Sequence, residues 1–175
     1  MTETSPQRGT SATDGAQAAF DLARGGRTDE LSALFAQGVS PDLVNDKGDT
    51  LVILAAYHGH LTTVAALLGA GADPDRVNGR GQTALAAASF KGALEVMRYL
   101  LDGGAAVDAT GADGRTALMV AAMFDRTDAL DLLLDRGADP SRRDAEGRDA
   151  ASHAAQMGAY GTPRRLAEAM TERDR

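Results

Sequence analysis

The sequence predicts an all-α solenoid of about five helix-turn-helix repeats joined by β-hairpin-like turns, with a modified capping repeat at each end. Two series of glycines carry this prediction, and each has a constant step of 33 residues. They are Gly48, Gly81, Gly114 and Gly147, and Gly38, Gly71, Gly104 and Gly137. The same step is kept by Thr50, Thr83 and Thr116 and by the pairs Leu67-Leu68, Leu100-Leu101 and Leu133-Leu134. Since no gap interrupts these series, one structural unit is expected to recur along the chain.

The unit from Gly81 to Gly104 illustrates the local structure expected in each repeat. Thr83 can accept an amide of the first helical turn, so it is expected to cap an alanine-rich helix that Gly92 ends. A second helix with one apolar face is predicted by Leu94, Met97, Leu100 and Leu101. Gly104 should follow it in the left-handed conformation, before a polar turn. Helices of about eight to ten residues are unstable alone in water, so stacking must stabilise them.

The two ends of the array depart from the repeat, as caps of a solenoid should. The segment Asp14-Gly15-Ala16-Gln17 predicts the start of the first helix by a capping box, after a disordered tail over residues 1–13. Asp149 replaces the threonine of the last repeat and keeps its capping chemistry. Thr162-Pro163 is expected to begin a final helix with Leu166, Ala169 and Met170 facing inward. One domain over residues 14–175 is expected, with repeats at about 14–44, 45–77, 78–110, 111–143 and 144–175.

This pattern resembles the ankyrin repeat, in which D-x-x-G-x-T-P-L-H-x-A-A-x-x-G-H is followed by leucines and then by G-A-D-x-N. The match is best over residues 45–75, which include Gly59-His60, and in Gly137-Ala138-Asp139. The resemblance implies a non-catalytic module that binds another protein as an adaptor or regulator. The family's Pro-Leu-His is replaced by Leu51-Val52-Ile53, Ala84-Leu85-Ala86 and Ala117-Leu118-Met119. Since the histidine that ties neighbouring turns together in the family is absent, the turns are expected to be looser or differently bonded.

Composition argues against several classes of function. A net charge of −7, spread along the chain, would repel a phosphate backbone or an anionic membrane, so neither nucleic acid nor a membrane is an expected partner. The sequence has no cysteine, which removes disulfides, thiolate metal ligands and a cysteine nucleophile. No apolar segment is long enough for a leader or a membrane span, so a cytoplasmic protein, monomeric when alone, is expected. The excess of arginine over lysine and the abundant alanine hint at a GC-rich bacterial genome.

Three motifs that could carry chemistry are better explained by the repeat. His58 and His60 would point to different sides of a helix, and His153 is several repeats away, so no zinc site is expected. Asp73-Pro74-Asp75 lacks the next oxygen ligand and the glycine of a calcium loop. The glycines of Gly79-Arg80-Gly81-Gln82-Thr83-Ala84 follow no buried strand, so they do not indicate a dinucleotide site. No catalytic residue, metal ion or cofactor is therefore expected.

The residues that end the first helix of each repeat are predicted to bind the partner. In the ankyrin pattern they face the concave surface, and here they are Tyr57, His58, Phe90, Lys91, Met123, Phe124, Gln156 and Met157. Leaving such an apolar side chain in water forgoes roughly 2 kcal/mol, which favours a partner that covers it. Charged turn tips beside these residues are expected to set specificity: Lys47, Asp49, Arg80, Asp113, Arg115 and Arg148.

Three alternatives remain open at this point. The apolar residues of this surface could simply pack against one another and against neighbouring turns. The chain could be an enzyme or small-ligand binder that uses groove carboxylates and His58. It could also self-associate through the same surface.

Overall fold

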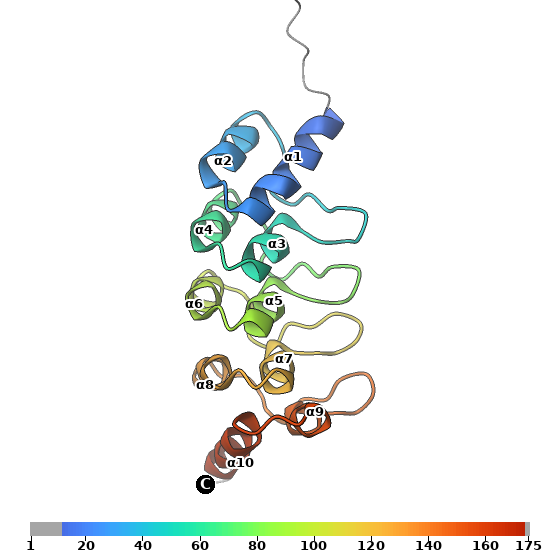
Figure 1. The fold of residues 1–175 in the computed structure, drawn as a ribbon, viewed down its shortest axis with the longest axis vertical. Helices are drawn as coiled ribbons and strands as arrows, with labels where there is room; N and C mark the ends of the chain where they lie inside the picture. The colour runs from blue at the N-terminus through green and yellow to red at the C-terminus, as the bar shows by residue number, and fades with distance from the viewer. Residues whose placement is uncertain (1–11, 174–175) are drawn as a thin grey trace, which may run out of the picture.

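The computed structural model describes residues 12–173, which form ten helices in two rows with hairpin loops projecting from one side (Figure 1). The inner row is α1 (Ala12–Gly25), α3 (Leu51–Tyr57), α5 (Ala84–Lys91), α7 (Ala117–Met123) and α9 (Ala150–Met157). The outer row is α2 (Thr28–Ala36), α4 (Leu61–Gly69), α6 (Leu94–Asp102), α8 (Thr127–Asp135) and α10 (Thr162–Arg173). Each helix packs on the next helix of its own row, so the chain is the all-α solenoid that the repeat predicts.

The inner helices begin where the sequence places their caps. The hydroxyls of Thr50, Thr83 and Thr116 accept the backbone amide three residues later, at 3.2, 3.1 and 3.2 Å. Asp149 does the same for α9, with its Oδ1 2.9 Å from the amide of Ser152. Each oxygen satisfies an amide that the first turn leaves without a helical partner. The predicted capping role of these four residues is confirmed.

Small residues inside the inner row let its helices approach closely. Ala55, Ala88, Ala121 and Ala154 keep the 33-residue step and are fully buried. Leu67, Leu100, Leu133 and Leu166 keep the same step on the outer helices and fill the space between the two rows. The core is therefore one continuous layer that runs from α1 to α10, and burial of each leucine contributes about 2 kcal/mol.

Carboxylates at the base of the hairpins join each repeat to the next. Asp42, Asp75 and Asp108 accept the backbone amides of Asp73, Ala106 and Asp139, at 3.0, 3.1 and 3.1 Å. Each acceptor lies 31 residues before its donor, so one bond recurs at every junction of the central repeats. These aspartates therefore belong to the scaffold.

The hairpin tips are bonded differently from the pattern of the resembled repeat. The Oδ1 atoms of Asn45, Asn78 and Asp144 each accept two amides of their own turn. Asn78 also donates from Nδ2 to Asp49 Oδ1 of the preceding hairpin, at 2.8 Å. Asparagine and aspartate thus bond the turns at positions where the family's histidine is missing.

Asp125 replaces a glycine at the turn between the two helices of the fourth repeat. The other repeats have Gly26, Gly59, Gly92 and Gly158 there, all with positive φ, and Asp125 adopts φ +52°. Its carboxylate accepts the amides of Gly161 and Thr162, both at 2.9 Å. These are the exposed amides at the start of α10, so the unfavourable backbone conformation is offset by capping the last helix.

Both ends differ in detail from the sequence-based expectation. α1 begins at Ala12, so Asp14 lies inside its first turn and is not the N-cap. The predicted tail before Ala12 lies outside the described residues. At the other end Leu166 is buried as expected, but Met170 is 44 % exposed, because no further repeat covers that side of α10.

Candidate functional site

Three aromatic side chains form a row along the inner helices. Tyr57 ends α3, Phe90 lies in the last turn of α5, and Phe124 is the C-cap of α7. The rings of Tyr57 and Phe90 stack with centroids 5.7 Å apart, and Phe124 meets Phe90 edge-on at 4.5 Å. Tyr57 remains 39 % exposed and Phe124 37 % exposed. The side chains of this aromatic row therefore both pack on one another and present an open apolar face.

Two adjoining hollows lie between the aromatic row and the hairpin loops. The first, of about 340 Å³, is lined by Tyr57 and Phe90 together with Ile53, Leu54 and Ala87. The second, of about 260 Å³, is lined by Phe90, Met123 and Phe124 with Ala86 and Val120. Arg80, Gln82 and Phe90 line both hollows. We call the two together the groove; it spans the first four repeats.

The turn-tip charges that the sequence singled out fall into two groups. Lys47, Arg80 and Arg115 line the groove, as does Asp113, whose Oδ2 lies 3.8 Å from Arg115 Nε. Asp49 also reaches the first hollow, but it is only 6 % exposed and is held by Asn78, contrary to the expectation of an exposed tip charge. Its hydrogen bond needs a buried acceptor, so Asp49 is part of the scaffold.

Arg148, Gln156 and Met157 lie beyond the groove. Arg148 is bound to Asp144 at 3.0 Å and to Glu146 at 2.7 Å, and its Nη1 lies 3.4 Å from Gln156 Oε1. Gln156 and Met157 are exposed at the end of α9 but line neither hollow. The predicted surface therefore continues past the groove into the last repeat, where Arg148 is engaged within its own hairpin.

A cluster of basic side chains flanks Tyr57. Lys91 Nζ lies 5.1 Å from the centre of the Tyr57 ring, and the His58 ring meets that ring edge-on at 5.2 Å. Burial lowers the pKa of His58, and the nearby positive groups of His60, Lys91 and Arg24 lower it further. This end of the groove is thus electropositive.

His58 and His60 do not diverge as the sequence led us to expect. Their rings stack with centroids 6.0 Å apart, because His58 caps the end of α3 and His60 lies in the turn before α4. Helical spacing does not apply to that turn. His60 Nε2 donates to the carbonyl oxygen of Arg24 at 2.8 Å, which ties the second repeat to the first.

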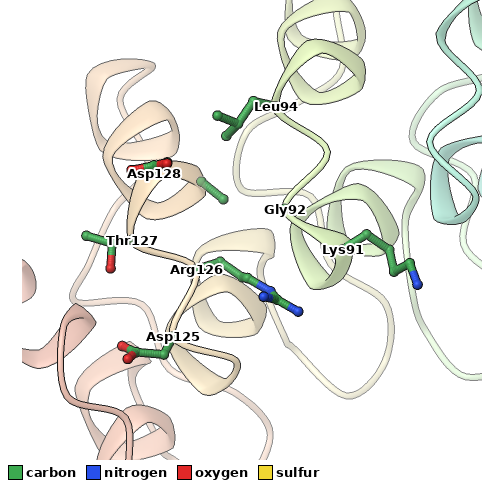
Figure 2. Close-up of a pocket in the computed structure, with 8 residues that line it drawn as sticks. Lys91, Gly92, Leu94, Asp125, Arg126, Thr127 and Asp128 are labelled. Carbon is green, nitrogen blue, oxygen red and sulfur yellow. The ribbon is translucent and has the colours of Figure 1, made fainter.

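A third hollow, of about 370 Å³, lies outside the groove between the α5–α6 and α7–α8 turns (Figure 2). Its charged residues serve the scaffold: Asp125 caps α10, and Arg126 Nε donates to the carbonyl oxygen of Phe90 at 3.1 Å. Figure 2 shows Arg126 reaching toward Gly92 across the hollow. We assign no site to it, because these groups already have partners.

Searches for metal and membrane features gave the following. Among residues 12–173, no three histidine or acidic side chains gather where they could hold a metal ion. In the same part of the chain, no helix has the length and apolar character that a bilayer crossing requires.

Arg24 is a groove residue that sequence reasoning missed. It lines the first hollow near Tyr57, and it lies 33 residues before Tyr57, at the same place in the repeat. That step could have identified it, but the first repeat lacks the threonine and turn that mark the position elsewhere. Ile53, Leu54 and Val120 could not be identified in this way, because inner-helix residues of similar type are mostly buried.

Comparison with known proteins agrees with this architecture. The family model for ankyrin repeats in three copies matches residues 16–111, 63–144 and 104–172. A similar protein is one from Pseudomonas aeruginosa whose name describes it as an ankyrin repeat protein; it is 56 % identical over 45 residues. That alignment spans about a quarter of the length of each chain, 26 % in both cases. Because the family model covers nearly all of the described helices, the chain belongs to the ankyrin repeat family.

Proposed function

We propose that the chain is a non-catalytic adaptor or regulator that binds a partner protein through the groove and the turn tips beside it. Ankyrin repeats are in general protein–protein interaction modules. The observation that carries the proposal is the aromatic row, which lines two adjoining hollows and keeps open ring faces. In keeping with the acidic, cysteine-free sequence, we place this role in the cytoplasm of a bacterium and expect the chain to be a monomer in the absence of its partner.

Energetics supports a protein partner. Aromatic and methionine side chains are the residues that interfaces favour at their centres, and each such anchor contributes about 2 kcal/mol or more when a partner covers it. The groove offers four of them within contact of one another or of one hollow: Tyr57, Phe90, Met123 and Phe124. An interface centred on them and including the turn tips would bury about 1,200 to 2,000 Å² in total.

The alternative of an enzyme or small-ligand binder has less support from the groove chemistry. Its two carboxylates are engaged, Asp49 with Asn78 and Asp113 with Arg115. His58 is exposed and packs beside Tyr57, His60 and Lys91, so it has no acidic group to orient it as a general base. A screen of metal ions and metabolites for thermal stabilisation tests the alternative, since an adaptor should respond to none.

Replacing Tyr57, Phe90 and Phe124 together by alanine is expected to abolish capture of the partner from a lysate of the source cells. Loss of three central anchors removes several kcal/mol of binding free energy, enough to take a complex below detection. Capture is measured by affinity purification and mass spectrometry, and folding by helical circular dichroism. The control is Tyr99→Ala, because Tyr99 is 41 % exposed on the outer helix α6. Survival of the same captured partner in the triple variant would exclude the groove as its site.

A further inference from the structure

The groove differs in charge from the rest of the molecule. Its lining includes four cationic side chains, Arg24, Lys47, Arg80 and Arg115, and two carboxylates, Asp49 and Asp113. The chain as a whole has a net charge of −7. Positive charge is therefore concentrated around the aromatic row, while the negative charge lies on other faces, including the outer helix α8 with Asp128, Asp131 and Asp135.

The cations form a border on both sides of the aromatic row. Lys47, Arg80 and Arg115 come from successive hairpins. Arg24 and Lys91 come from the last turns of inner helices α1 and α5. The apolar strip between these borders is lined by Tyr57 and Phe90. A segment lying along the strip would pass positive side chains at both of its edges.

Several of these cations are not neutralised within the chain. Across residues 12–173, Lys47 and Lys91 make no ion pair, and Lys91 instead lies over the Tyr57 ring. Arg80 is largely exposed and reaches Asp49 only at 3.5 Å. In the same residues, Arg115 Nε is buried without a hydrogen bond, since its nearest carboxylate oxygen is 3.8 Å away. These donors are available to an incoming carboxylate.

We propose that the groove takes an extended acidic segment of a partner protein, with carboxylates against Lys47, Arg80 and Lys91 and apolar side chains over Tyr57 and Phe90. This inference rests on the proposed function and specifies the chemistry of the partner. Alternating acidic and apolar side chains fit a strip that is apolar at its centre and cationic at its borders. Attraction between unlike charges would also speed the encounter and disfavour basic partners.

A short acidic segment fits this surface better than a long polyanion does. Nucleic acid or an anionic bilayer would extend past the groove and meet the acidic faces of the repeats, where the net negative charge would repel it. A segment confined to the first four repeats meets only the groove.

Selection from a phage-displayed library of random dodecapeptides tests the proposal. The intact chain is the bait, and the Tyr57, Phe90 and Phe124 triple alanine variant is the bait for counter-selection. Enrichment of peptides rich in aspartate and glutamate with interspersed apolar residues supports the proposal. Enrichment of neutral or basic peptides that still require the aromatic row would overturn the acidic-segment inference and leave the proposed function standing. Failure to enrich any peptide that requires the row would overturn both.

Charge reversal then tests the contacts with a selected peptide, measured by fluorescence anisotropy. The Lys47→Glu/Lys91→Glu variant should bind at least about tenfold more weakly, and affinity for the intact chain should fall as salt rises from 20 to 300 mM, roughly the range over which exposed charges become screened. Neither lysine makes an ion pair across residues 12–173, so folding should be unaffected. The matched control is Arg76→Glu/Arg98→Glu, at exposed arginines outside the groove. Equal weakening by both variants would overturn the proposal.

Two further measurements identify the wrong occupant. A dodecamer of single-stranded DNA that binds as tightly as the peptide, with the same dependence on Lys47 and Lys91, would replace the acidic segment by a nucleic acid. Concentration-dependent mass in sedimentation that the lysine reversal abolishes would replace it by a second copy of the chain, docked through an acidic outer face. Either result would overturn the proposal.

Discussion

Replacing Asp144 with alanine is expected to lower the free energy of unfolding by about 3 kcal/mol, because it removes one partner from a buried charged network. Asp144 Oδ2 lies 2.8 Å from His153 Nε2 and 3.0 Å from Arg148 Nη2, and its Oδ1 accepts the amides of Glu146 and Arg148 at 2.9 Å. His153 is itself buried, and its Nδ1 has no hydrogen-bond partner among the described residues. The variant would leave that ring with no partner for either nitrogen. Urea unfolding at pH 7 measures the loss.

The same substitution should also reduce the dependence of stability on pH. Burial raises the pKa of Asp144, but the bonds from Arg148, His153 and the Glu146 amide outweigh it and hold the pKa well below the usual range. A group whose pKa is lower in the folded state stabilises the protein above its unfolded pKa, about 3.9, and loses that contribution as the pH falls further. The difference between wild type and Asp144→Ala should therefore be smaller at pH 3 than at pH 7. A difference that stays constant would show that the ionised carboxylate is not what stabilises this hairpin.

Gly111→Ala is expected to cost roughly 2 to 3 kcal/mol, as overpacking against rigid neighbours does. A Cβ at Gly111 would lie 2.2 Å from Gly81 Cα and 2.5 Å from the Gly81 carbonyl oxygen. That oxygen accepts the Gly111 amide at 3.1 Å, so relieving the clash would separate the two hairpins and break their hydrogen bond. Thermal and urea unfolding of the variant measure the cost.

Gly104→Ala is the matched control for this prediction. Gly104 has φ +95° and nothing within 4 Å of the position its Cβ would take, so the substitution should cost only the backbone term of about 1 kcal/mol. Equal losses in the two variants would contradict a close approach of the hairpins at Gly81 and Gly111.

The features that every repeat shares could be predicted from the sequence. Thr50, Thr83 and Thr116 cap their helices because one local hydrogen bond decides each cap, and the step of 33 residues repeats it. The position of the aromatic row at the ends of the inner helices follows from the same step for Tyr57 and Phe90. Phe124 lies one residue beyond the step, yet it caps α7 and still reaches the Phe90 ring.

The contacts that differ between repeats could not be predicted in this way. Asp49 looks like a surface charge in its own hairpin, and only the neighbouring Asn78 makes it a buried acceptor. Asp125 looks like a mismatch in a glycine series until α10 places two amides beside it. Both side chains are set by a residue about 30 or more positions away, so local pattern carries no signal of their role.

Site-specific photo-crosslinking tests most directly whether the partner lies over the aromatic row. Benzoylphenylalanine would replace Phe124 in the groove in one variant and Tyr99 on α6 in another, two aromatic positions with similar exposure of 37 % and 41 %. After irradiation in source cells, a covalent adduct with one partner protein is expected from position 124 and none from position 99. An adduct from position 99 with the same partner, and none from position 124, would contradict a binding site in the groove.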